Sequence, residues 1–273
     1  MYYIADIGIN HNGDIVTAFK MIKRAAEIGI DCVKFQKRNI DCTYTQEELA
    51  KSVESPFGNT YGDLKRGLEF DYNAYVKIAK YCDALEIDWS ASVWDIDSVD
   101  FLMQFDVPFI KIPSAMATNI ELLKYVSTFD KPVILSTGGC NMWDVRAAIE
   151  ILTIESLTIM QCTSIYPSPN DRIDLDVIDT YGYTFGSYRR YGYSGHEEGW
   201  YPSVLAAVKG VTVIERHVTL DKEMWGTDQS SSLEFEEYIH MMGDIDVAKE
   251  ICGRDVKYEY HEEREKLAKY RRP

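Results

Sequence analysis

The stretch DIVTAFKMIKRAAEIGIDCVKFQK, residues 14–37, carries two hydrophobic patterns of different period side by side. Its first part repeats at the three- and four-residue spacing of an α-helix, with the helical spacing set by Val16, Phe19, Ile22, Lys23 and Ala26. In its last part, the two-residue period of a β-strand places Lys34 and Gln36 on one face. A helix that leads directly into a strand is the repeating unit of a parallel sheet.

The same alternation recurs along nearly the whole chain. The expected strands are YYIADIGIN (2–10), DCVKFQK (31–37), DWSASVW (88–94), VPFIKIPSA (107–115), PVILSTGG (132–139), LTIMQCTS (157–164), YRRYGYSGH (188–196) and VTVIERHVTL (211–220). Amphipathic segments such as MWDVRAAIEIL (142–152) separate them. Eight such units predict a (β/α)₈ TIM barrel, formed as a single domain by residues 1–273. A doubly wound open sheet is the alternative.

Composition and charge narrow the class of protein. The 273 residues are 46% apolar and 12% aromatic, enough for one large core. A formal charge of −15 argues against nucleic acid as a partner, because phosphate backbones require a basic face. Six cysteines without a CxxC pair, no leader segment and no apolar run of ~20 residues predict a soluble, cytoplasmic protein without a membrane partner.

One connection is too long for a simple turn. Residues 38–70 separate the second expected strand from the next helical pattern and contain the turn-rich segment SPFGNTYGD. Long ordered loops are usually functional, so we expect an elaborated loop on the active face.

In a barrel of this kind, active groups lie at the carboxyl ends of the strands. Lys34 and Lys111 lie within apolar strands, where an ammonium group is costly to bury without an anion. With the backbone amides of Gly138 and Gly139 they would suit a phosphate or phosphocarboxylate. A lysine that extends its ammonium to the surface, and a glycine-rich turn without ligand, are the alternatives.

Two histidines end the last two expected strands. His196 and His217 would lie on neighbouring strands ~5 Å apart and could share one metal ion. Two imidazoles with oxygen ligands favour Mn²⁺, Mg²⁺ or Fe²⁺ over structural zinc. Ordinary hydrogen bonding of the two rings is the alternative. For NHNGD (10–14) the alternative to a functional role is a turn with a helix N-cap, and for Trp94 it is packing.

Taken in order, the motifs resemble the N-acetylneuraminate (sialic acid) synthase family. They run from residue 4 to residue 234 and comprise IADIGINHNGD, VKFQ, SVDFL, FIKIPSA, TNIELL, KPVILSTGG, CTSIYPSP, GYSGHEEG, VIERHVTLD and MWGTDQSSSLE. The resemblance implies a metal-dependent condensation of phosphoenolpyruvate with the aldehyde of an N-acylated hexosamine such as N-acetylmannosamine. Mn²⁺ or Mg²⁺ would be the cofactor.

The resemblance also implies the roles of individual residues. The catalytic group would be Asp6, Lys34, Lys111, His196 and His217, with His196 and His217 as the metal ligands. The substrate-binding group would be Asn10, Asn12, Gln36, Ser92, Ser114, Ser136, Ser164, Tyr166, Ser194 and Asp228. Of these, Asn10 and Asn12 match a loop over the site, and Tyr166 and Asp228 approach the sugar.

The chain departs from the family pattern in several places. Asp6 replaces a glutamate, Ser92 a threonine and Ser164 an asparagine, and Met116 stands where many members have a sugar-binding glutamate. Many family members continue into a C-terminal antifreeze-like domain, which we expect this chain to lack, so that a homodimer would rest on barrel contacts alone. Two alternatives stay open: a different sugar aldehyde of the legionaminate or pseudaminate type, and a barrel that binds without catalysing.

Overall fold

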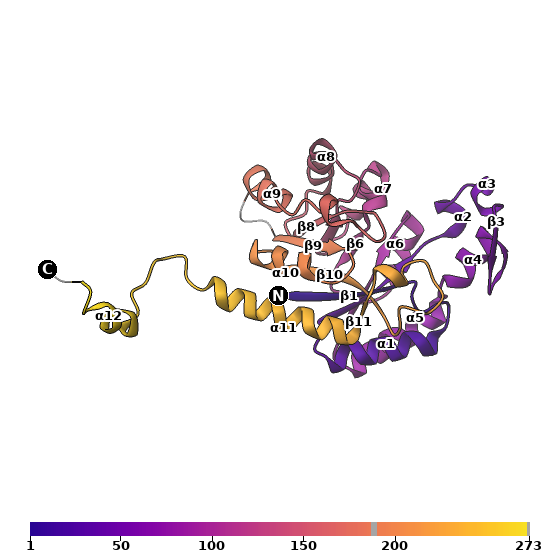
Figure 1. Cartoon of the computed structure of the whole chain (residues 1–273). Coiled ribbons are helices and arrows are strands. Elements are labelled where there is room, and N and C mark those ends of the chain that lie inside the picture. The colour runs from indigo at the N-terminus through magenta and orange to yellow at the C-terminus, as the bar shows by residue number, and fades with distance from the viewer. Residues whose placement is uncertain (187–189, 272–273) are drawn as a thin grey trace.

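Each barrel strand pairs in parallel with the strand before it, and the first also pairs with the last, in the computed structural model (Figure 1). The structure describes residues 1–186 and 190–271. Within these ranges eight strands close the barrel: β1 (Tyr2–Gly8), β2 (Cys32–Lys37), β5 (Asp88–Val93), β6 (Ile110–Ile112), β7 (Val133–Ser136), β8 (Leu157–Cys162), β9 (Arg190–Gly195) and β10 (Val213–Thr219). This confirms the predicted (β/α)₈ barrel against the open sheet. Residues 188 and 189 of the expected seventh strand lie outside the described residues.

Helices cover the outside of the ring. They are α1 (Ile15–Glu27), α5 (Tyr72–Ala84), α6 (Ile96–Leu102), α7 (Ile120–Val126), α8 (Met142–Leu152), α9 (Val177–Phe185), α10 (Tyr201–Val208) and α11 (Phe235–Cys252). The two-residue strand β11 (Leu233–Glu234) pairs with the end of β10, and α12 (His261–Leu267) follows on an arm that leads away from the barrel (Figure 1). No helix within the described residues has the length and apolarity needed to cross a membrane.

Helix α1 forms where the sequence predicts it, but its buried face coincides with the expected one only in part. Its N-cap is Asp14, whose carboxylate accepts the backbone N–H groups of the first turn, as the cap interpretation of NHNGD expects. The buried residues are Ala18, Met21, Ile22 and Ala25. Val16 and Lys23 of the expected face are exposed, because the small alanines let the helix lie closer to the sheet than the bulkier side would.

The barrel interior has two layers of different chemistry. At the amino ends of the strands, apolar side chains fill the tube: Ile4, Cys32, Phe109, Ile134, Met160 and Val213. Two residues further along each strand, the inward positions become polar, as with Asp6 after Ile4 and Glu215 after Val213. The alternation of side chains along a strand therefore places a closed apolar floor beneath a polar chamber.

Residues 38–70, here called the β2 excursion, form a small subdomain rather than an irregular loop. They contain α2 (Ile40–Thr43), α3 (Gln46–Leu49), β3 (Ser52–Ser55), β4 (Gly58–Thr60) and α4 (Tyr61–Leu68). The excursion leaves the carboxyl end of β2, and its antiparallel β3–β4 hairpin stands beside the barrel (Figure 1). Leu64 and Leu68 of α4 pack on Ile9, which fixes the excursion to the loop after β1.

Candidate active site

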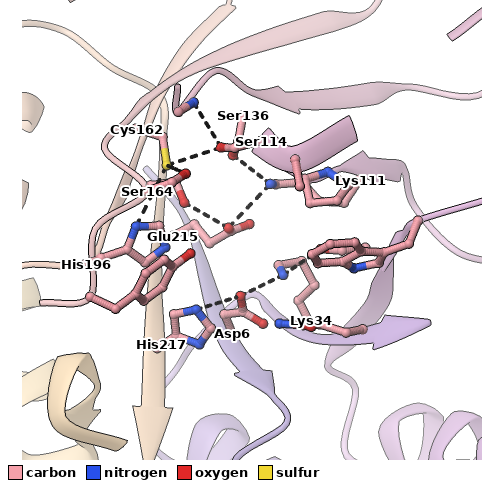
Figure 2. Close-up of a pocket in the computed structure, with 18 residues that line it drawn as sticks. Asp6, Lys34, Lys111, Ser114, Ser136, Cys162, Ser164, His196, Glu215 and His217 are labelled. Atoms are coloured by element: carbon pink, nitrogen blue, oxygen red, sulfur yellow. Dashed lines mark hydrogen bonds and ion pairs between the residues drawn. The ribbon is translucent and has the colours of Figure 1, made fainter. Parts of the chain in front are cut away.

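A cavity of about 260 Å³ opens at the carboxyl ends of the barrel strands (Figure 2). Its wall contains all but three of the residues that the resemblance implies for the site. The lining residues are Asp6, Lys34, Gln36, Ser92, Trp94, Lys111, Pro113, Ser114, Ala115, Ser136, Gly138, Cys162, Ser164, Tyr166, Ser194, His196, Glu215 and His217.

The two lysines are buried on opposite sides of a charged cluster. Lys34 Nζ lies 2.7 Å from Asp6 Oδ2 and donates to Ser92 Oγ at 2.8 Å. Lys111 Nζ donates to Ser136 Oγ at 2.7 Å and lies 3.5 Å from Glu215 Oε1. Each lysine side chain is only 2% exposed. The ammonium groups therefore point inward and do not reach the surface.

The electrostatic balance of the two lysines differs. Burial acts to lower the pKa of Lys34, but the carboxylates of Asp6 and Glu215 outweigh it, and the pKa is raised. For Lys111, burial prevails over the attraction of Glu215, and the pKa is lowered. Burial opposes ionisation of Glu215, but Lys111 and Lys34 hold its pKa at about 2, so the carboxylate is charged at neutral pH. The carboxylates of the protein therefore compensate the charge of Lys111 less fully than that of Lys34.

His196 is held in one tautomer. Its Nδ1 lies 2.9 Å from the carbonyl oxygen of Thr163, which can only accept, so Nδ1 carries the proton and Nε2 keeps a lone pair. Burial acts to lower the pKa of His196, but Cys162 and the Thr163 carbonyl raise it overall. A backbone carbonyl on the second ring nitrogen is the usual support of a metal-binding histidine.

His217 lies beside His196 in the cavity wall. The two ring centroids are 5.5 Å apart, and His217 Nε2 lies 3.4 Å from Asp6 Oδ2. Asp6 and Asp228 act to raise the pKa of His217, but burial outweighs them and the pKa is lowered. The lowered pKa favours the neutral ring. Within the described residues His217 Nδ1 and one oxygen each of Asp6 and Glu215 make no hydrogen bond. Imidazole nitrogens and carboxylate oxygens are the types of donor that fit a divalent cation.

Glycines make room for these groups at two places. A Cβ on Gly138 would lie 2.2 Å from Ser164 Oγ and 2.8 Å from Ser114 Oγ, and the Gly138 amide donates to that Ser114 oxygen. At Gly8, which has a φ of +54°, a Cβ would lie 3.1 Å from Cε1 of His217. Both are sites where the backbone closely approaches a functional side chain.

Three predicted residues lie in the loops above the cavity and outside its lining. The Asn10 amide donates to the Val218 carbonyl and to Ser232 Oγ, both at 2.8 Å. Asn12 donates to the Trp225 carbonyl at 2.6 Å, and the Asp228 carbonyl accepts from Ser232 at 2.6 Å. The contacts of Asn10 and Asn12 fasten the loop after β1 to the end of β10 and to the loop after it. Their expected part in sugar binding stays a prediction.

Five lining residues had no role assigned from the sequence, and three of them, Glu215, Cys162 and Trp94, can contribute polar or aromatic contacts. Glu215, two positions before His217, completes the charged cluster. Cys162 Sγ lies 3.8 Å from His196 Nδ1; burial acts to raise its pKa, but His196 and other neighbours lower it to about 7. Trp94 forms part of the wall with Arg38 stacked 4.5 Å from its ring. Glu215 could have been found from the sequence, because it lies two residues from the predicted ligand His217 on the same strand and therefore faces the same side.

At the mouth, Tyr166 lies over the histidine pair. Its ring centroid is 4.1 Å from that of His196 and 6.1 Å from that of His217. Met116 is not part of the cavity wall; it packs against the outer core. No carboxylate therefore occupies that position, as the departure from the family pattern suggests.

The fold and the cavity together define a (β/α)₈-barrel protein with a charged site at the carboxyl ends of its strands, the arrangement of barrel enzymes. Residues 21–257 match the NeuB family. The chain is 35% identical over 260 residues to N-acetylneuraminate-9-phosphate synthase from Homo sapiens, covering 94% of this chain and 72% of the relative. It is 32% identical over 262 residues to N,N'-diacetyllegionaminic acid synthase from Campylobacter jejuni, covering 93% and 78%.

A solved structure agrees with these matches. The N-acetylneuraminic acid (sialic acid) synthetase from Leptospira borgpetersenii serovar Hardjo-bovis, in complex with citrate, is 25% identical and has a TM-score of 0.86. The match covers 99% of this chain and 90% of that chain. The chain belongs to the NeuB family of sialic and related nonulosonic acid synthases, which confirms the resemblance seen in its motifs.

Proposed function

We propose that this protein condenses phosphoenolpyruvate with the open-chain aldehyde of an N-acylated hexosamine, releasing phosphate and forming a nonulosonic acid. The observation that carries the proposal is that two buried lysines and two buried histidines face one cavity. The names of the human and Campylobacter relatives place the same class of product in the family.

The charges of the cavity suit phosphoenolpyruvate. Lys34 and Lys111 are balanced by Asp6 and Glu215, so the protein groups sum to roughly no net charge when the histidines are neutral. A phosphate carries about two negative charges near pH 7 and a carboxylate one more. A divalent cation would offset about two of these three negative charges. Ser114, Ser136 and Ser194 add hydroxyl donors around the same space.

His196 and His217 would hold the metal, for which we propose Mn²⁺ or Mg²⁺. Within the described residues no group of three or more histidine, cysteine, aspartate or glutamate side chains is arranged to hold a metal ion. The remaining ligands would thus be water and substrate oxygens, as in open catalytic sites. When bound, the cation supplies Lewis acidity toward the aldehyde oxygen.

The residues of this chain would orient the reactants and manage protons. Lys34 and Lys111 hold the phosphate and carboxylate so that C3 of the enol faces the aldehyde carbon, an orientation that can supply several kcal/mol. The new C–C bond leaves a cation at C2, and the aldehyde oxygen takes up a proton. Water adds at C2 and gives one proton to a carboxylate, which replaces the proton taken up by the aldehyde oxygen. The C2–O bond to phosphate then breaks as the remaining hydroxyl proton passes to the phosphate, leaving the keto acid. Asp6 Oδ1, which has no hydrogen-bond partner within the described residues, is available as that acceptor.

The sugar is less determined than the chemistry. N-acetylmannosamine is our first candidate, and a diacetamido hexose of the legionaminate or pseudaminate type is the second. The observation that favours the second is Met116, which leaves the cavity without the glutamate that the family pattern places there. The expected homodimer and the cytoplasmic location stay predictions.

The test is phosphate release from phosphoenolpyruvate with Mn²⁺ and a panel of N-acylated hexosamines. We expect release that requires both aldehyde and metal and that is lost in His217→Ala. His240→Ala, which removes an exposed histidine on α11, is the matched control and should keep full activity. Release with a diacetamido sugar alone would select the second candidate. No release across the panel from folded protein would favour a barrel that binds without catalysing.

A further inference from the structure

The two histidines of the cavity each adjoin a charged residue that points the other way. Glu197 follows His196, and Arg216 precedes His217. Because successive residues of an extended chain face opposite sides, the imidazoles point into the barrel while the carboxylate and guanidinium point outward, beneath α10. Neither charged group lines the cavity.

These two charged groups form a fully buried pair. Both side chains are 0% exposed, and Arg216 Nη1 lies 2.7 Å from Glu197 Oε1. Arg216 Nη2 donates to the Glu197 backbone carbonyl at 2.7 Å, and Nη1 also donates to the Gly199 carbonyl at 2.8 Å. Tyr193 donates its hydroxyl to Glu197 Oε2 at 2.7 Å. The guanidinium therefore grips both the side chain and the backbone of the segment that follows His196.

The backbone at His196 is also held from the opposite side. The Ser168 amide donates to the His196 carbonyl at 3.0 Å, and Ser168 and Glu197 form a parallel β-bridge. On this side the Thr163 carbonyl binds the His196 ring. Position 196 is thus clamped between the loop after β8 and, through Arg216, strand β10, which carries His217.

A buried ion pair is a poor source of stability, because desolvation of the two charges offsets their attraction. Apolar residues would serve packing beneath α10 at least as well. What the pair does provide is a fixed distance and direction between two backbones, since the planar guanidinium bonds in a rigid fork. The two backbones that it joins are those that carry His196 and His217.

We propose that Glu197, Arg216 and Tyr193 are positioning residues that set the separation and orientation of the His196 and His217 imidazoles. The proposal rests on the proposed function only where it concerns metal affinity. The ring positions themselves are testable without metal. The variants are Glu197→Gln, which removes the carboxylate charge, Arg216→Lys, which removes the planar guanidinium, and Tyr193→Phe, which removes only the hydroxyl bound to Glu197.

The first measurement is histidine NMR on metal-free protein labelled in its five imidazole rings. We expect the signals of His196 and His217 to move in each variant, while those of His11 and His261 stay in place. The matched control is Tyr75→Phe, which removes another buried tyrosine hydroxyl, bound to the Gln36 carbonyl at 3.0 Å on β2 and not to β9 or β10. It should lower the melting temperature without moving the two signals.

The second measurement is Mn²⁺ affinity by electron paramagnetic resonance. Loss of a residue that orients a metal ligand typically costs 10–100-fold, so we expect about that loss for Arg216→Lys and Glu197→Gln. Tyr75→Phe should remain within about twofold of the wild type on the same scale.

The outcomes separate this inference from the proposed function. If the wild type binds no Mn²⁺ but the two histidine signals move, the metal assignment fails and the positioning role stands. If the variants only lose thermal stability, with unmoved histidine signals and unchanged Mn²⁺ affinity, the pair is purely structural and the inference is overturned. Should Arg216→Lys not fold, Glu197→Gln and Tyr193→Phe decide, since the latter keeps the ion pair intact.

Discussion

His11, which no part of the proposed chemistry uses, should make the fold sensitive to acid. Its ring is buried and stacked on Phe70 with centroids 4.1 Å apart, and its Nδ1 accepts the Gly13 amide at 3.0 Å. Burial lowers the pKa of His11 to about 3, from 6.5 in an exposed histidine. Between these two pKa values the unfolded chain therefore binds a proton at His11 that the folded protein does not bind.

The sign and size of the effect follow from proton linkage. Because the folded pKa lies below the unfolded one, the stability is fully present above about pH 6.5 and is lost as the pH falls toward 3. The complete loss is about 5 kcal/mol at 1.36 kcal/mol per pKa unit. Between pH 7.5 and pH 5.0 the unfolded state alone titrates, and the loss is about 2 kcal/mol.

The assay is urea unfolding of the wild type and His11→Asn at both pH values. Asparagine can accept the same amide two residues on, as in an Asx-turn, but it does not titrate. We expect the variant to be less stable at pH 7.5 because the stacking on Phe70 is lost, yet to lose about 2 kcal/mol less than the wild type on acidification. His261→Ala, which removes an exposed histidine, should follow the wild type. Equal acid losses in the wild type and His11→Asn would refute the reasoning.

The remaining predictions concern the cavity. Lys111→Met leaves Glu215 buried without its nearest cation and removes an anion contact, so kcat/KM for phosphoenolpyruvate should fall about 100-fold or more. Glu215→Gln takes away the charge that supports Lys111, so the pKa of Lys111 falls further and KM should begin to rise at a lower pH than in the wild type; parallel pH profiles would contradict this. Gly8→Ala should displace His217 and lower Mn²⁺ affinity about tenfold, while Gly29→Ala, with φ +81° and open space around it, adds backbone strain without that loss.

Much of the site was predictable because strand periodicity determines which residues face inward. The two-residue period places Lys34 and Gln36 on one side of β2, and adjacency of β9 and β10 brings His196 near His217. Both inferences use only local spacing and strand order, which a barrel makes regular.

Contacts across the barrel were less accessible to sequence reasoning. Lys111 on β6 meets Glu215 on β10, and these strands are not neighbours, so register cannot reveal the pair. His11 is stacked on Phe70 at the end of the β2 excursion, a contact between two loops. The buried face of α1 depended on how closely alanines let it approach the sheet, which periodicity alone does not give.

The apolar floor of the barrel has a consequence for the way in which small molecules enter and leave the cavity. Ile4, Phe109 and Met160 belong to the packed layer that seals the tube below the charged chamber, and Tyr166 lies at its opposite, open end. Because the cavity opens at one end only, a molecule that enters first is covered by the one that enters second and can leave only after it. We therefore expect the reactants of the proposed condensation to bind and leave in a fixed order, with the last to enter leaving first.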